Sequence, residues 1–254
     1  MLIGCCCSLD QAESAHAAGF DYLECPLVSL LPEQDESHFA PVLAAYRAAP
    51  LPARAFNIFL PGDLKVIGPA VDWGRVQRYV ETALARARQV GAELLVFGSG
   101  KARMVPDGFS REQAGDQLVR FLHQVADVAT ANELTITIEP LNRKESNIIN
   151  SVAEGVELAQ RVGRAPIRVL ADFYHMDEEK EPLSHLSEFK AWLAHIHVAD
   201  TDRGAPGTGA YPYDEFASEV RRAGYTGMIS IECRWRDLAA EAGPAVQFLR
   251  RTFG

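Results

Sequence analysis

The sequence predicts a (β/α)8 barrel, the TIM barrel, formed as a single domain over residues 1–254. Three observations favour this fold. A length of 254 residues is typical of one such barrel. Short apolar, β-branched segments alternate with helix-like segments along the whole chain, as in parallel sheets. Finally, several strand-like segments end at a residue that can bind a metal ion, and such barrels carry their active sites at these strand ends.

The first half of the chain predicts four strand–helix pairs. Residues 8 and 11, and again 110 and 113, have the Ser–Gln spacing of a helix capping box. Gly19 and Gly91 are expected to end their helices, because glycine readily adopts the left-handed conformation found there. We expect strands over 2–7, 20–25, 53–59 and 93–98, and helices over 8–19, 37–48, 72–90 and 110–131.

The second half predicts four more pairs, with strands over 134–139, 167–172, 194–200 and 228–232, and helices near 151–162, 186–193, 213–223 and 237–252. No linker or low-complexity segment interrupts the eight units, which close naturally into a barrel. An open doubly wound sheet is the alternative. It is disfavoured because no GxGxxG follows the first strand and the polar residues fall on consecutive strands.

The composition excludes several partners. The chain has 25 basic and 34 acidic residues, a net charge of −9, and lacks the basic cluster of a nucleic-acid binder. Arg86 and Arg88 are predicted to lie on the solvated side of a helix. No apolar stretch approaches membrane-spanning length and no signal peptide is evident, so we expect a cytoplasmic protein. The five cysteines, including the triplet at 5–7, are interpreted as small apolar filler in a reducing compartment.

Four consecutive strand-like segments end in candidate metal ligands: Glu139, Asp172, His197 and Glu232. Side chains alternate along a strand, so Glu139 shares the inner face with Thr135 and Thr137. Two glutamates, an aspartate and a histidine form an oxygen-rich site suited to Mg, Mn or Co. His195 lies on the same face as His197 but deeper, as a hydrogen-bonding partner would.

Further polar residues follow the same strand ends. Asn142 and Glu145 come after Glu139, His175 lies three residues beyond Asp172, and Arg203 lies six residues beyond His197. In loops above a metal ion, His175 and Arg203 are expected to bind the substrate.

One more loop, Gly98–Phe109, carries Lys101 and Arg103. Two interpretations stay open for it. The two cations either meet a phosphate or carboxylate of the substrate, or belong to a solvated loop.

The strand-end motifs IEPLNRKESN, ADFYHM, HIHVADTDRGAPGTG and ISIEC resemble the sugar phosphate isomerase/epimerase superfamily with xylose isomerase-like barrels, and within it the D-tagatose 3-epimerase (D-psicose 3-epimerase) branch. The resemblance implies one Mn, Mg or Co ion held by the four ligands above. It also implies that Glu145, His175 and Arg203 contact the substrate and that Glu139 and Glu232 are the catalytic acid and base. Members of that branch often form homo-oligomers. They are also usually some tens of residues longer than this chain.

The resemblance implies a metal-dependent ketose 3-epimerase or aldose–ketose isomerase acting on a small sugar. A lyase or hydrolase acting on keto-sugars with the same metal site is an open alternative, because its proton-abstraction step would be identical. So is a binding protein without catalysis. A phosphodiesterase of the apurinic-endonuclease type is disfavoured, because it needs further metal ligands from the second to fourth strands and a basic surface.

Overall fold

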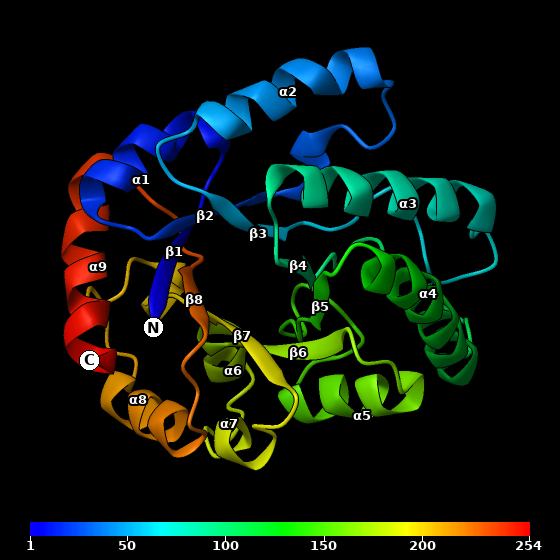
Figure 1. The fold of residues 1–254 in the computed structure, drawn as a ribbon. Helices are drawn as coiled ribbons and strands as arrows, with labels where there is room; N and C mark the ends of the chain where they lie inside the picture. The colour runs from blue at the N-terminus through cyan, green and yellow to red at the C-terminus, as the bar shows by residue number, and fades with distance from the viewer.

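The computed structural model describes residues 1–254 and contains one closed barrel of eight parallel strands in chain order (Figure 1). Each strand pairs with its neighbours in sequence, and β1 pairs with β8 to complete the ring. The predicted (β/α)8 fold is therefore confirmed. The strands are β1 (Leu2–Cys6), β2 (Tyr22–Pro26), β3 (Ala53–Asn57), β4 (Leu94–Phe97), β5 (Thr135–Ile138), β6 (Ile167–Asp172), β7 (Leu193–Val198) and β8 (Met228–Ile231).

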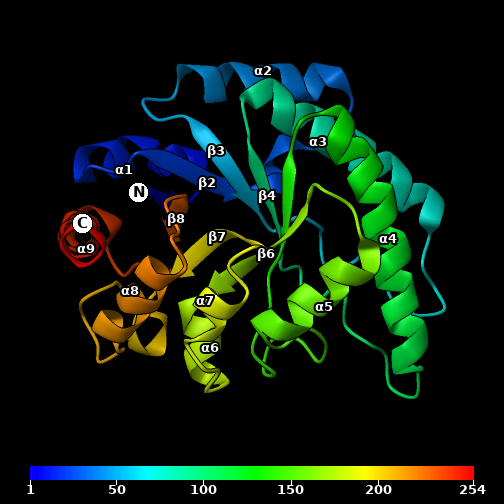
Figure 2. The ribbon, with the colours of Figure 1, turned by 60° about the horizontal axis from the view of Figure 1, so that its bottom comes forward.

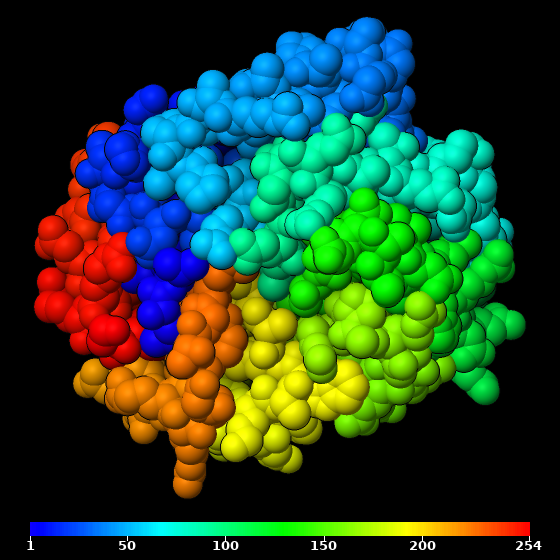
Figure 3. Space-filling view, in the orientation of Figure 1, coloured from blue at the N-terminus to red at the C-terminus, as the bar shows by residue number.

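Helices surround the barrel on its outer side, as Figures 1 and 2 show. The outer helices include α1 (Ala12–Ala18), α2 (Glu36–Ala48), α3 (Trp73–Val90), α4 (Arg111–Ala131), α5 (Val152–Val162), α7 (His185–Glu188), α8 (Tyr213–Arg222) and α9 (Leu238–Phe253). Short 3₁₀ turns η1 (Leu9–Gln11), η2 (Leu27–Leu30) and η3 (Thr201–Arg203) lie in the connections. The first and last helices, α1 and α9, pack side by side where the ring closes (Figure 3).

Local sequence signals explain where several helices begin and end. Ser8 and Gln11 form the expected capping box, although it opens η1 before α1. The Ser110 side chain accepts a hydrogen bond from the Gln113 N–H at the start of α4. Gly19 and Gly91 end α1 and α3 in the left-handed conformation, with φ of 89° and 104°.

The region between β6 and β7 differs from the prediction. A helix over 186–193 is wrong, because Leu193 already begins β7 and only the four-residue α7 forms there. A helix, α6 (Phe173–Glu178), instead follows β6 directly and lies inside the ring of outer helices (Figure 1). Asp172 caps it by accepting a hydrogen bond from the His175 N–H at 3.2 Å. His175 therefore stands on a helix and not on a loop.

Arg86 also differs from the prediction, since its side chain is buried and not solvated. Its guanidinium donates to the backbone carbonyls of Leu30 and Gln34 at 3.1 and 2.9 Å and lies over the Phe39 ring. These carbonyls would otherwise be buried without donors, so Arg86 fastens α3 to the segment that follows β2.

The main apolar core lies between the strands and the helices, and a smaller cluster formed by Tyr22, Ala55, Leu94, Val96 and Leu170 fills the barrel interior. Cys5 and Cys7 belong to the main core, whereas Cys6 does not, as strand alternation requires. None of the helices combines the length and apolar character needed to cross a membrane.

Candidate metal centre and active site

Strand register brings the four predicted metal ligands together. In the pairing of β6 with β7, Asp172 lies directly beside His197. Glu139 and Glu232 follow the last residues of β5 and β8, so they stand at the same end of the barrel. One potential ligand atom from each of the four residues lies within 4.8 Å of all the others. Each strand therefore delivers one donor to a common point.

His197 occupies the centre of this group. Its Nδ1 lies 3.3 Å from Glu139 Oε1, 3.8 Å from Asp172 Oδ2 and 3.6 Å from Glu232 Oε2. Neither His197 Nδ1 nor Glu139 Oε1 makes a hydrogen bond, although both atoms are buried. Buried polar atoms normally have hydrogen-bond partners, so a buried atom without one calls for an explanation. A cation among these donors would satisfy both atoms.

A buried glutamate fixes the orientation of His197. Glu24, on β2, places Oε1 2.8 Å from His197 Nε2 and Oε2 2.8 Å from His195 Nε2. Because a carboxylate only accepts, His197 carries a proton on Nε2, and Nδ1 is the ring nitrogen that faces the four-residue group. Metal-binding histidines characteristically have such a carboxylate partner. His195 thus has the deeper, supporting position expected from the sequence.

Two further side chains complete this buried network. Ser230 Oγ donates to Glu24 Oε2 at 2.6 Å and lies 2.7 Å from the Tyr22 hydroxyl. Burial opposes ionisation of Glu24, but His197 and His195 outweigh it and hold the pKa of this carboxyl well below its usual range. The network links β2, β7 and β8. It also requires Gly4, because a Cβ at that position on β1 would lie 2.2 Å from the Tyr22 ring.

The end of β4 makes room for Glu139. A Cβ at Gly98 would lie only 2.1 Å from Glu139 Oε2, so the carboxylate occupies space that any other residue would fill. Arg103 stabilises the backbone at the ends of β4 and β5. Its buried guanidinium donates to the carbonyls of Phe97 and Glu139 at 2.9 and 2.7 Å. Burial lowers the pKa of Arg103 to about 10. Arg103 is therefore neither a substrate ligand nor a solvated residue.

The two glutamates sit in different electrostatic surroundings. Burial, and then the nearby Glu232, raise the pKa of Glu139. Burial opposes ionisation of Glu232 as well, but His197 and Arg203 outweigh it and lower the pKa of Glu232 to about 2. Neighbouring carboxyls whose pKa values are shifted in opposite directions are typical of acid–base sites.

The donor set fits one hard or borderline divalent cation, since it combines three carboxylates with one imidazole. The two unpartnered atoms at its centre and the Glu24 partner of His197 support the same interpretation. We therefore describe Glu139, Asp172, His197 and Glu232 as the candidate metal centre. A second group, Cys6 with Glu24 and His197, shares His197 with this centre.

Arg203 lies above the candidate metal centre. Its guanidinium donates to Glu232 Oε2 and, at 3.1 Å, to Glu145 Oε1. It also lies 4.9 Å from the centre of the Tyr174 ring. Both Asp202 and Arg203 adopt positive φ angles of 59°, which are unfavourable for residues other than glycine. Both residues thus adopt the left-handed conformation, and the Arg203 side chain contacts Glu145 and Glu232.

His175 lies beside the centre at the start of α6. Its Nδ1 accepts hydrogen bonds from the backbone and side-chain amides of Asn142, at 3.1 and 2.9 Å. The proton therefore belongs to Nε2, which is buried, has no partner and lies 3.9 Å from Asp172 Oδ2. This N–H is available to a bound molecule. Asn142 also donates to Glu145 at 3.2 Å, so the loop after β5 contacts both His175 and Arg203.

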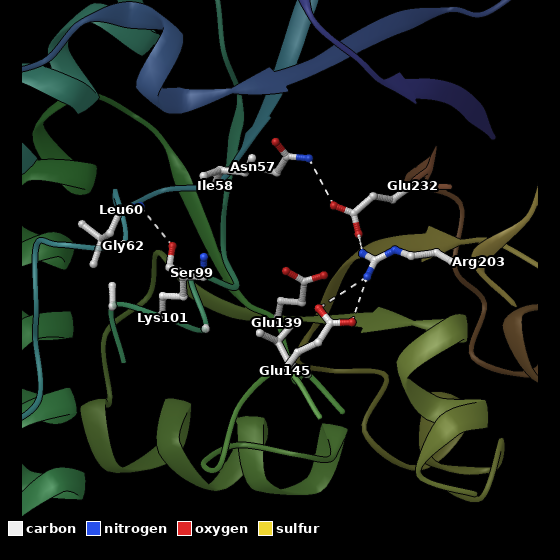
Figure 4. Close-up of a pocket in the computed structure, with 13 residues that line it drawn as sticks. Asn57, Ile58, Leu60, Gly62, Ser99, Lys101, Glu139, Glu145, Arg203 and Glu232 are labelled. Carbon is white, nitrogen blue, oxygen red and sulfur yellow. Dashed lines mark hydrogen bonds and ion pairs between the residues drawn. The ribbon is translucent and has the colours of Figure 1, made fainter. Parts of the chain in front are cut away.

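A pocket of about 250 Å³ opens onto this site (Figure 4). That volume lies slightly below the roughly 300–1,000 Å³ of typical drug-sized ligand sites and suits a smaller molecule. Glu139, Glu145, Arg203 and Glu232 line it on one side, whereas Ser99 and Lys101 stand on the other. Four of the seven site residues expected from the sequence thus line this pocket. Asp172 and His197 lie beside two of them in the candidate metal centre, and His175 lies beside Asp172.

Two residues of the site were not identified from the sequence. Glu24 stands in an apolar strand, and its charge in that setting was the available signal. Asn57 ends β3, and its side-chain amide donates to Glu232 Oε1 at 3.3 Å. Nothing in the sequence around Asn57 marks it, because the last residue of a strand is often polar.

Comparisons with known proteins agree with this architecture. Residues 12–252 match the family model described as xylose isomerase-like TIM barrel, so the chain belongs to this family. The D-psicose 3-epimerase of Agrobacterium fabrum is 32% identical over 124 residues, covering 48% of this chain and 43% of that protein. The ketose 3-epimerase of Arthrobacter globiformis is 26% identical over 233 residues, covering 87% and 76%.

A solved structure shows the same fold. The D-psicose 3-epimerase of Clostridium cellulolyticum H10, crystallised with D-tagatose, superposes with a TM-score of 0.86 at 21% identity and covers 100% of this chain and 99% of that one. At that identity the likeness concerns the fold alone. In sequence, the chain spans about half the length of several curated relatives it matches, including the Agrobacterium epimerase.

Proposed function

We propose that the protein is a divalent-metal-dependent ketose 3-epimerase. The observation that carries this proposal is the pair of glutamates, Glu139 and Glu232, which flank one buried Asp–His pair at the bottom of a small pocket. Two carboxyls on either side of a bound sugar can exchange a proton with the same carbon from opposite faces. The epimerases among the relatives support the same choice.

Glu139, Asp172, His197 and Glu232 would hold the ion, with Mn, Mg or Co suited to this donor set. When bound, such an ion polarises a carbonyl and stabilises negative charge on oxygen. One glutamate then removes the proton from the carbon next to the ketone, giving a cis-enediolate, and the other returns a proton to the opposite face.

Glu145, His175 and Arg203 orient the sugar in this proposal. The unpartnered Nε2–H of His175 donates to a sugar oxygen. Arg203 already donates to Glu232 and Glu145, so it can hold a catalytic carboxylate while its remaining N–H groups meet a hydroxyl. Glu145 fixes Arg203 in return.

The test is turnover of a panel of free and phosphorylated ketoses by metal-loaded protein in heavy water. Epimerisation through an enediolate places deuterium at the epimerised carbon, because the glutamate proton exchanges with solvent. Glu139→Gln and Glu232→Gln should each lose several orders of magnitude in rate. The exposed Glu13→Gln serves as the matched control.

Two results would redirect the proposal. Products without deuterium would indicate a hydride shift between carbons, as in an aldose–ketose isomerase. Cleavage or elimination products would indicate a keto-sugar lyase or hydrolase on the same metal site. Unchanged activity in either glutamine variant would remove the two-glutamate mechanism altogether.

A further inference from the structure

The side of the pocket opposite Arg203 is formed by the loop after β4. Lys101 and Ser99 lie there, facing Glu139 and Glu145 across the pocket (Figure 4). Lys101 remains exposed at the rim. This wall has a different chemistry from the carboxylate-rich wall that holds the candidate metal centre.

The ammonium of Lys101 has no partner among the pocket carboxylates. Glu145 and Glu232 both pair with Arg203, on the other side. The neighbouring Lys65, by contrast, has hydrogen-bond partners, because its ammonium donates to the backbone carbonyls of Gly62 and Lys101 at 2.7 and 2.8 Å. In a chain with a net charge of −9, Lys101 is thus a cation in the pocket without an anion of its own.

Other hydrogen-bond donors lie beside it. Ser99 adopts a positive φ of 42° and begins a turn in which its carbonyl accepts from the Ala102 and Arg103 N–H groups. The N–H groups of Gly100 and Lys101, inside that turn, have no acceptor. Ser99 Oγ accepts from the Leu60 N–H at 2.9 Å, which leaves its own proton free to donate. Successive free N–H groups in such turns favour anions.

Hydrogen bonds tie this loop to the rest of the barrel. Arg103 anchors its end to the carbonyls of Phe97 and Glu139, and Lys65 caps the carbonyl of Lys101. One pocket therefore joins a candidate metal centre to a fixed wall that carries an ammonium, a hydroxyl and unpaired amides.

We propose that the substrate carries an anionic group, a phosphate or a carboxylate, at the end away from the reacting carbon, and that Lys101 and its turn bind that group. This inference rests on the proposed function and narrows its substrate class to ketose phosphates or keto-uronates. The anion would stand on the opposite wall from Glu145 and Glu232, whose charges are paired with Arg203.

The test measures binding, not turnover, by calorimetry on metal-loaded protein. The probes are D-fructose against D-fructose 6-phosphate, D-ribulose against D-ribulose 5-phosphate, and D-fructuronate as the carboxylate. We expect at least one anionic probe to bind roughly 10- to 100-fold more tightly than its neutral parent, since charge-assisted hydrogen bonds contribute that much. Lys101→Met should abolish the difference and leave neutral sugars unaffected.

Lys190→Met removes the same charge from an exposed site outside the pocket and should retain the preference. Raising the salt concentration should weaken the anionic probes selectively. The phosphate and carboxylate probes together decide which anion is preferred. Neutral sugars binding as tightly as every anionic probe, or equal losses in both lysine variants, would overturn the inference. Neither result would affect the deuterium test of the epimerase proposal.

Discussion

Replacing Glu24 by glutamine removes one negative charge from the buried network while keeping its shape. Glu24 holds both His197 and His195 at 2.8 Å and accepts from Ser230 at 2.6 Å. Glutamine offers one oxygen and one amide group, so it cannot accept from all three. We expect His197 to lose its carboxylate partner, and its Nδ1 to become a weaker donor to the ion.

The size of the effect follows from this geometry. Losing the carboxylate partner of a metal-binding histidine lowers metal affinity roughly 10- to 100-fold, or about 1.4 to 2.7 kcal/mol. The metal-free protein should also unfold more easily, by at most the roughly 3–5 kcal/mol lost when one partner of a buried ion pair is removed. Glutamine keeps part of the network, so the lower end of that range is expected.

Manganese affinity is measured by competition with a chelator of known affinity, and stability by denaturant unfolding without metal. Glu13→Gln, on the exposed face of α1, loses the same charge without touching the network and should match wild type. A Glu24→Gln protein that binds manganese as tightly as wild type would refute the supporting role assigned to Glu24.

Other substitutions test the remaining parts of the site. Asp172→Ala should abolish tight binding of about one ion per chain, measured by elemental analysis, and stoichiometric binding that survives would remove this residue from the metal centre. Arg203→Met should lower kcat/KM while metal content stays intact; if both fall together, Arg203 supports the ion. Gly98→Ala should weaken manganese binding, because its Cβ would lie 2.1 Å from Glu139 Oε2, and unchanged affinity would contradict the packing described. Arg103→Met should lower the free energy of unfolding by about 2–5 kcal/mol, because two buried carbonyls lose their donors. Denaturant titration measures this loss, and a value under about 1 kcal/mol would refute the anchoring role.

The sequence predicted the barrel and the candidate metal ligands for one reason. Alternation along each strand, together with the convergence of parallel strand ends, places Glu139, His197 and Glu232 from local information alone. The barrel topology then places neighbouring strands side by side in chain order, which brings these residues together. Side chains whose position depends only on their own strand could therefore be assigned from the sequence.

The features that the sequence did not reveal depend mostly on contacts between distant segments. Glu24 reaches His197 only because the barrel closes. Arg86 and Arg103 resemble solvent-facing arginines in sequence, and only the packed structure reveals that they serve buried carbonyls. The six-residue α6 is less than two turns long, so its apolar periodicity is too short to recognise.

The buried network has a consequence for folding. The candidate metal ligands all come from the second half of the chain, but Glu24 and Tyr22 come from β2, on the far side of the β1–β8 seam from Ser230. An ion that binds most tightly when Glu24 orients His197 stabilises the closed ring by its binding free energy. Metal binding and the pairing of β1 with β8 should therefore be coupled, so that removing the ion also weakens the junction between the two ends of the sheet.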